Sequence, residues 1–221
     1  MTHPPGEVLR AYAAGATELT RRLLVEAHLT LCRECFALVP QYRDPRDRLP
    51  EATITDEVQM PGFERVWYAV ERAGEAKVCP QAATVLPGPF SAWLPAPAAL
   101  QWITMWPQRT RSAVLARDGE TGSALHLSYY PPNSTYPRHR HVGLEENVIL
   151  SGGYQNGDVH VEAGDWVVGA PGTEHTPTTR ADEECWCLSR VEPPGIRFRG
   201  WRELARRLVF FRASTLPTHQ P

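Results

Sequence analysis

Residues 136–153 read YPRHRHVGLEENVILSGG and contain most of a metal-binding pattern. Alternate side chains of a β-strand face the same side, so His139 and His141 point together. Glu145 follows after a short turn, at the start of the next strand, and His175 supplies a third imidazole further along the chain. Three imidazoles and one carboxylate suit zinc, iron, manganese, nickel or copper(II), so the ligand types do not fix the metal.

The carboxylate ligand has one alternative, because Glu146 directly follows Glu145. His126, His160 and His219 stand outside the pattern. A histidine without ligand spacing is more often a core or surface side chain than a ligand, so we assign these three no role.

The sequence around this pattern alternates between apolar and polar residues, as a half-buried strand does. Leu125, Leu127 and Tyr129 share one strand face, with polar neighbours on the other. Asn156-Gly157 predicts a two-residue hairpin turn. Many short antiparallel strands predict a barrel or sandwich. Further short apolar runs occupy residues 102–106, 148–150, 166–168 and 185–188.

The N-terminal third instead has apolar residues at helical spacing, including Leu9 and Tyr12, and three or four helices fit. Gly15 ends the first helix, and Thr17 with Glu18 opens the second. The fold class that we expect is therefore α+β, with a small zinc-binding helical bundle followed by an antiparallel β-barrel.

Four nitrogen and sulfur ligands occur within the first 35 residues. On one continuous helix, His28, Cys32 and Cys35 project from one face. His3 completes a tetrahedral shell if the first helix packs beside the second, and a shell without an open position is typical of structural zinc. A thioredoxin-like redox motif is the alternative for the two cysteines, but it requires a strand-helix-strand context that is missing here.

Composition limits the partners. The 23 basic and 25 acidic residues nearly cancel, which argues against direct nucleic acid binding. No apolar run approaches the roughly 20 residues that cross a bilayer, and the N-terminus lacks the basic, apolar and small-residue order of a signal peptide, so we expect a cytoplasmic protein with no membrane contact. Five cysteines, an odd number, do not form a paired disulfide framework.

We divide the chain into a helical zinc domain at residues 1–78, a proline-rich linker and wrap-on segment at 79–97, and a β domain at 98–221. Residues 201–211 return to helical spacing and predict a C-terminal helix that lies on the β domain. Cys185 and Cys187 face the same side of a strand and are poorly placed for a mutual disulfide. Burial as small apolar side chains is favoured over a redox or sensing role.

The pattern HxHxxxE, followed by Gly152, Gly164, Gly172 and His175, resembles the two-part signature of the cupin fold. Ala170 replaces the proline that is usual before the last histidine, with Pro171 beside it. The whole chain is similar to the ChrR family of zinc-binding anti-sigma factors. The segments that carry this resemblance are HPPGEVLRAYAAG, EAHLTLCREC, LPGPFSAWLP, YPRHRHVGLEENVILSGG, EAGDW and CWCL.

This resemblance implies that the helical domain sequesters an extracytoplasmic-function sigma factor and that the cupin domain, which allows oligomers, triggers release under singlet oxygen or organic peroxide stress. Leu9, Tyr12, Phe63, Trp67 and Tyr68 are candidate contacts for the sigma factor and equally good core residues. Two alternatives remain: a metal-dependent cupin oxygenase or isomerase with an accessory zinc domain, and a module that binds a small ligand.

Overall fold

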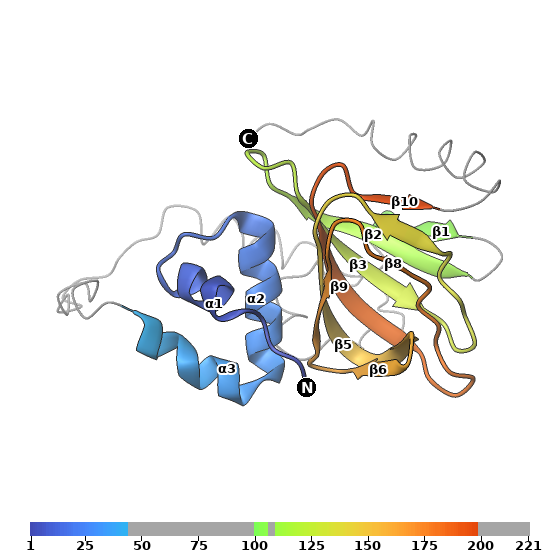
Figure 1. Ribbon diagram of the computed structural model, residues 1–221, viewed down its shortest axis with the longest axis horizontal. Coiled ribbons are helices and arrows are strands. Elements are labelled where there is room, and N and C mark those ends of the chain that lie inside the picture. The colour runs from blue at the N-terminus through green and yellow to red at the C-terminus, as the bar shows by residue number, and fades with distance from the viewer. Residues whose placement is uncertain (44–99, 106–108, 199–221) are drawn as a thin grey trace, which may run out of the picture.

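A computed structural model describes residues 1–43, 100–105 and 109–198 (Figure 1). A helical region precedes an antiparallel β domain, as the sequence predicts. The helices are α1 (Gly6–Ala13), α2 (Leu19–Leu31), α3 (Arg33–Leu38) and the 3-10 turn η1 (Val39–Tyr42). The strands are β1 (Ile103–Met105), β2 (Thr110–Arg117), β3 (Ala124–Tyr130), β4 (His139–His141), β5 (Glu145–Asn156), β6 (Val159–Glu162), β7 (Trp166–Gly169), β8 (Glu174–His175), β9 (Cys185–Val191) and β10 (Ile196–Phe198).

The start of α2 follows the prediction. Gly15 has a φ of 67°, a conformation that favours glycine, and reverses the chain after α1. Glu18 then caps α2, because its carboxylate accepts hydrogen bonds from the backbone N–H groups of Thr20 and Arg21.

The expected continuous helix from His28 to Cys35 is wrong. Cys32 has extended backbone angles (φ −116°, ψ 101°), which end α2 and begin α3. Its backbone N–H still closes α2 on the His28 carbonyl, and its sulfur accepts a hydrogen bond from the Cys35 N–H as the cap of α3. Since one residue caps two helices, the chain bends at the proposed zinc ligand.

The strands form two antiparallel sheets. The large sheet has the order β1-β2-β3-β9-β5-β6, with β7 also paired to β5, and the small sheet has the order β10-β4-β8. The hairpin after β5 is displaced by one residue from the prediction. Asn156 pairs with Val159, so Gly157 and Asp158 form the loop, and Gly157 takes the positive φ of 64° that this turn requires.

The helices pack against one face of the large sheet (Figure 1). Leu24 and Val25 of α2 share a hydrophobic core with Leu125 and Leu188 of the sheet. The opposite face has a second, smaller core that includes Ile149, Tyr154, Val161, Cys185 and Cys187. The strict alternation of strand side chains therefore separates a surface that contacts the helices from the interior of the β domain.

Several predictions fall outside the described residues: the helix at 201–211, the linker at 79–97, the candidate contacts Phe63, Trp67 and Tyr68, and His219. Leu9, another candidate contact, is buried in the core. Within the described residues, every helix is too short or too polar to cross a membrane.

Candidate metal centres

His3, His28, Cys32 and Cys35 come together as the sequence predicts. One ligand atom from each lies within 4.8 Å of all the others. His3 approaches from the N-terminal segment, and its Nδ1 lies 3.5 Å from the Cys32 sulfur and 3.2 Å from the Cys35 sulfur. The other three ligands come from the last turn of α2, the bend and the first turn of α3.

The side chains of this N-terminal cluster fit a metal ion. Neither ring nitrogen of His28 has a hydrogen bond of good geometry within the described residues. Burial and the neighbouring His3 lower the pKa of His28 to about 4, so the ring is neutral and offers a lone pair. Burial and the adjacent Cys32 raise the pKa of the Cys35 thiol to about 12. A thiolate here therefore needs a cation beside it, and a divalent metal ion is one that the ligand types suit.

The protein encloses the N-terminal cluster on several sides. The His28 ring packs edge-on against Trp166 of β7, with 5.9 Å between the ring centroids. Thr2 bonds to the Asp165 carboxylate and to the backbone of Trp166, which ties the N-terminal segment to the sheet. His3 Nε2 lies 3.6 Å from the carboxylate of Glu34. No position remains open among the four ligands, as in structural zinc sites.

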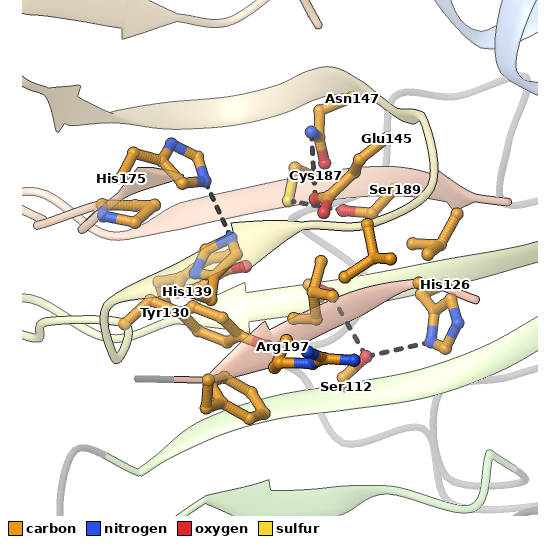
Figure 2. Close-up of a pocket in the computed structure, with 18 of the residues that line it drawn as sticks. Ser112, His126, Tyr130, His139, Glu145, Asn147, His175, Cys187, Ser189 and Arg197 are labelled. Atoms are coloured by element: carbon orange, nitrogen blue, oxygen red, sulfur yellow. Dashed lines mark hydrogen bonds between the residues drawn. The ribbon is translucent and has the colours of Figure 1, made fainter. Parts of the chain in front are cut away.

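His139, His141 and His175 form the second cluster, and their ligand nitrogens also lie within 4.8 Å of one another. His139 and His175 are direct partners between β4 and β8, and their Nε2 atoms are 2.8 Å apart. Gly169 leaves room for the third ring, since a Cβ there would lie 2.5 Å from His141 Nε2. Figure 2 shows His139 and His175 facing each other at one side of the pocket.

Hydrogen bonds fix the tautomer of each histidine in this cupin cluster. Nδ1 of His139 donates to the Pro137 carbonyl at 2.9 Å, and Nδ1 of His175 donates to the Asn156 side-chain oxygen at 2.9 Å. Thr173 Oγ1 donates its proton to a backbone carbonyl, so it accepts from His141 Nδ1 at 2.9 Å. All three Nε2 lone pairs therefore point inward, as metal-binding imidazoles require.

The position of Glu145 also suits a ligand. Its Oε2 lies 3.4 Å from His141 Nε2. Burial acts to raise the pKa of Glu145, but His141 and His139 outweigh it and leave the pKa below its ordinary value. Burial lowers the pKa of His175 to about 4, and the neighbouring histidines add to this. A carboxylate beside neutral imidazoles fits a divalent cation.

Glu146 cannot replace Glu145, because it lies on the opposite face of β5. Its side chain is buried toward the helices, where Arg190 Nη1 donates to it at 2.8 Å and Arg21 Nε at 2.9 Å. The Glu146 carboxylate therefore belongs to the contact between α2 and the sheet.

Arg190 is the centre of this contact, and its side chain is only 1% exposed. Besides Glu146, its guanidinium donates to Glu18 and, at 2.8 Å, to Glu192. Burial acts to raise the pKa of Glu18, but hydrogen bonds from Arg190 and Thr20 hold it below its ordinary value. The carboxylate that caps α2 thus also pairs with the sheet, and we call Glu18, Arg21, Glu146, Arg190 and Glu192 the interdomain charge network.

A cavity of about 440 Å³ opens beside the cupin cluster. His139, His175 and Glu145 line one part of it, and Cys187 lies nearby with its sulfur 3.6 Å from Ser189 Oγ. Cys185 and Cys187 are buried free thiols on one strand face, as predicted. Within the described residues, the chain thus combines one enclosed cluster with one that faces an open volume.

Sequence reasoning missed three parts of these sites. Asn156 hydrogen-bonds His175, and Glu34 lies 3.6 Å from His3 Nε2; neither stands at ligand spacing. The interdomain charge network joins Glu18 to Arg190, 172 positions apart, so no local pattern could find it. His126 had no assigned role, although it lines the cavity. Its place opposite Leu125 and Leu127 on an alternating strand was the available signal.

Comparisons with known proteins agree with this geometry. The family model described as the ChrR cupin-like domain matches residues 92–193. The anti-sigma-E factor ChrR of Cereibacter sphaeroides is 27% identical over 205 residues, which cover 90% of this chain and 92% of that protein.

Solved structures extend the comparison. A crystal structure of Rhodobacter sphaeroides SigE in complex with the anti-sigma ChrR contains a chain with 27% identity and a TM-score of 0.62, covering 86% of this chain and 98% of that chain. The polyketide cyclase RemF from Streptomyces resistomycificus is 20% identical, with a TM-score of 0.41, over 47% of this chain and 82% of that one. Residues 92–193 thus match a ChrR cupin-like domain, and the chain is similar to a ChrR anti-sigma factor along nearly its whole length.

Proposed function

We propose that this protein is an anti-sigma factor that sequesters an extracytoplasmic-function sigma factor through its N-terminal domain, residues 1–78. The observation that carries the proposal is the extent of the similarity: 90% of this chain aligns with 92% of a protein named as an anti-sigma factor. A sigma factor as partner would place the protein in the cytoplasm.

Zinc at the N-terminal cluster would act as a crosslink. His3, His28, Cys32 and Cys35 would hold it, and a closed shell leaves no position for a substrate. The helices around it are short, so metal binding would supply much of their stability. Phe36 follows Cys35 in α3 and is 66% exposed, which makes it a candidate contact for the sigma factor.

The cupin domain would be the sensor. His139, His141, Glu145 and His175 would hold zinc, iron, manganese or nickel, and a bound metal supplies Lewis acidity or, for iron and manganese, electron transfer. The cavity beside the cluster gives small molecules a place next to the metal. We infer that singlet oxygen or an organic peroxide acts here and that release of the sigma factor follows.

The test is co-purification of the full-length protein with sigma factors from its own genome, followed by transcription assays with RNA polymerase. We expect the wild-type chain to retain an extracytoplasmic-function sigma factor and to block its transcription. A Cys32→Ser, Cys35→Ser variant should lose the partner. A His139→Ala, His175→Ala variant should retain it but fail to release it after treatment with singlet oxygen or tert-butyl hydroperoxide. Failure of the wild-type chain to bind any such sigma factor would refute the proposal.

The cavity also favours a second candidate function, a metal-dependent oxygenase or isomerase. In that case the cupin metal would bind substrate, and the zinc domain would serve assembly. Dioxygen consumption by the iron-loaded protein with an organic substrate, at a rate that His175→Ala abolishes, would support the enzyme and count against a purely sensory cupin.

A further inference from the structure

The cavity beside the cupin cluster has a second polar group, formed by Ser112 of β2 and by His126 and Ser128 of β3. In Figure 2, Ser112 and His126 lie at the opposite side of the pocket from His139 and His175. Apolar side chains line the cavity too, including Val142, Val191, Ile196 and Phe198. A molecule in this cavity would thus meet polar groups at both ends.

The hydrogen bonds within this second polar group bear on which ring nitrogen of His126 can donate to a ligand. Ser128 donates to Ser112 Oγ at 3.2 Å, and Ser112 Oγ lies 3.4 Å from His126 Nδ1. Burial lowers the pKa of His126 to about 4, with Arg117 adding to the effect, so the ring is neutral and keeps one N–H. Where the Ser112 hydroxyl donates to Nδ1, that proton is on Nε2, and His126 offers an N–H donor without a formal charge.

The charged residues around the cavity limit which chemical group of a ligand can lie beside His126. Arg197 is the cation among the described lining residues, but it is exposed and pairs in register with Arg140, which is also exposed. Its neighbours Ile196 and Phe198 are the register partners of the cluster histidines. Arg197 lines the cavity and remains exposed, so its guanidinium keeps contact with solvent. A carboxylate beside His126 would have no buried counter-ion among the described lining residues, and burial of an unpaired charge is costly.

We propose that the cavity binds a small organic molecule with a metal-binding oxygen at one end and an uncharged oxygen acceptor, a carbonyl or hydroxyl, at the other, where His126 donates to it. The cavity volume of about 440 Å³ lies in the range of sites for such molecules. The proposal rests on a metal at the cupin cluster, deepens the sensing part of the proposed function and is independent of sigma-factor binding.

Three benzohydroxamates test this in the full-length, zinc-loaded protein. The hydroxamate anchors each probe on the metal, and the para substituent is acetyl, isopropenyl or carboxylate. Acetyl and isopropenyl have nearly the same shape, but only acetyl accepts a hydrogen bond. By isothermal titration calorimetry, we expect the acetyl probe to bind about tenfold more tightly than the isopropenyl probe, the net effect of one buried hydrogen bond. The carboxylate probe should bind most weakly.

Two variants locate the effect. His126→Phe should remove the acetyl preference while the isopropenyl probe still binds. His160→Phe is the matched control, because His160 lies on β6 outside the cavity and pairs with Glu183, and it should keep the preference. Metal content and circular dichroism before and after titration establish that both variants retain zinc and fold.

Three results would overturn the proposal: no binding by any probe, an acetyl preference that survives in His126→Phe, or tightest binding of the carboxylate probe. None of them bears on the sigma factor, whose co-purification is measured separately. A failure of this site is therefore distinct from a failure of the proposed function.

Discussion

At the N-terminal cluster four ligand atoms lie within 4.8 Å of one another, three of them on buried residues, whereas the cupin histidines border a cavity of about 440 Å³. The first cluster combines two cysteines and two histidines, three of which lie where α2 ends and α3 begins. The second cluster consists of imidazoles on short strands. The difference shows how ligand geometry separates stability from chemistry. A closed shell can only hold segments together, while ligands beside an open volume admit a further molecule.

The strongest test of this contrast removes the metal from each cluster in turn. Cys32→Ser should cost the N-terminal cluster its metal and unfold the helical region, since structural zinc contributes on the order of 10 kcal/mol to folding. Hydrogen exchange of the α2 amides, with metal content by mass spectrometry, measures both effects. The matched variant, His175→Ala, should lose only the cupin metal and leave α2 protected. Equal loss of protection in the two variants would erase the distinction.

The interdomain charge network gives the next largest effect, because its central Arg190 is buried with a side chain only 1% exposed. Arg190→Met leaves Glu18 and Glu146 without their shared partner, and breaking a buried ion pair costs about 3–5 kcal/mol. Urea denaturation measures the free energy of unfolding. Arg22→Met is the control: Arg22 is exposed and lies 3.8 Å from Glu26, so its loss should change that free energy by about 0.5 kcal/mol or less.

Two adjacent glutamates allow a sharper comparison of moderate size. Glu145→Gln should weaken metal binding at the cupin cluster roughly 10- to 100-fold, with little change in unfolding. Glu146→Gln should do the reverse, since its carboxylate serves Arg190 and Arg21. Zinc titration and urea denaturation of both variants separate the two roles. If Glu146→Gln weakens metal binding more than Glu145→Gln does, the ligand assignment is wrong.

The smallest expected effect concerns a cavity histidine that is not a ligand. The pKa of His126 is about 4 in the folded protein against an ordinary 6.5, so between these values the unfolded chain binds more protons. The free energy of unfolding should therefore fall as the pH drops from 6.5 to about 4, by at most about 1.4 kcal/mol per pH unit for one group. His126→Phe should reduce this slope in urea denaturation, and identical slopes would show that His126 does not contribute.

Spacing could find part of each ligand set, because strand alternation places His139 beside His141 and a helical turn separates His28 from Cys32, whereas His3 and His175 come from distant segments. The same local rules failed where tertiary contacts decide. They extended one helix through Cys32, and they placed the hairpin loop one residue early, at Asn156. Asn156 instead belongs to β5, and its side-chain oxygen hydrogen-bonds His175. The choice between the two glutamates also needed the structure, since a register change of one residue exchanges the two faces of a strand.

Because the large sheet is a single layer of backbone, neighbouring residues of one strand face the cavity on one side and the helices on the other. One peptide unit, about 3.8 Å between Cα atoms, joins Glu145 in the cavity to Glu146 under α2. The same is true of Ser189 and Arg190 on β9. A ligand that displaces the inner residue of either pair must also shift its outer neighbour, without any chain of intervening side chains. The strand itself is thus the shortest connection by which an event at the metal reaches the helices that would hold a sigma factor.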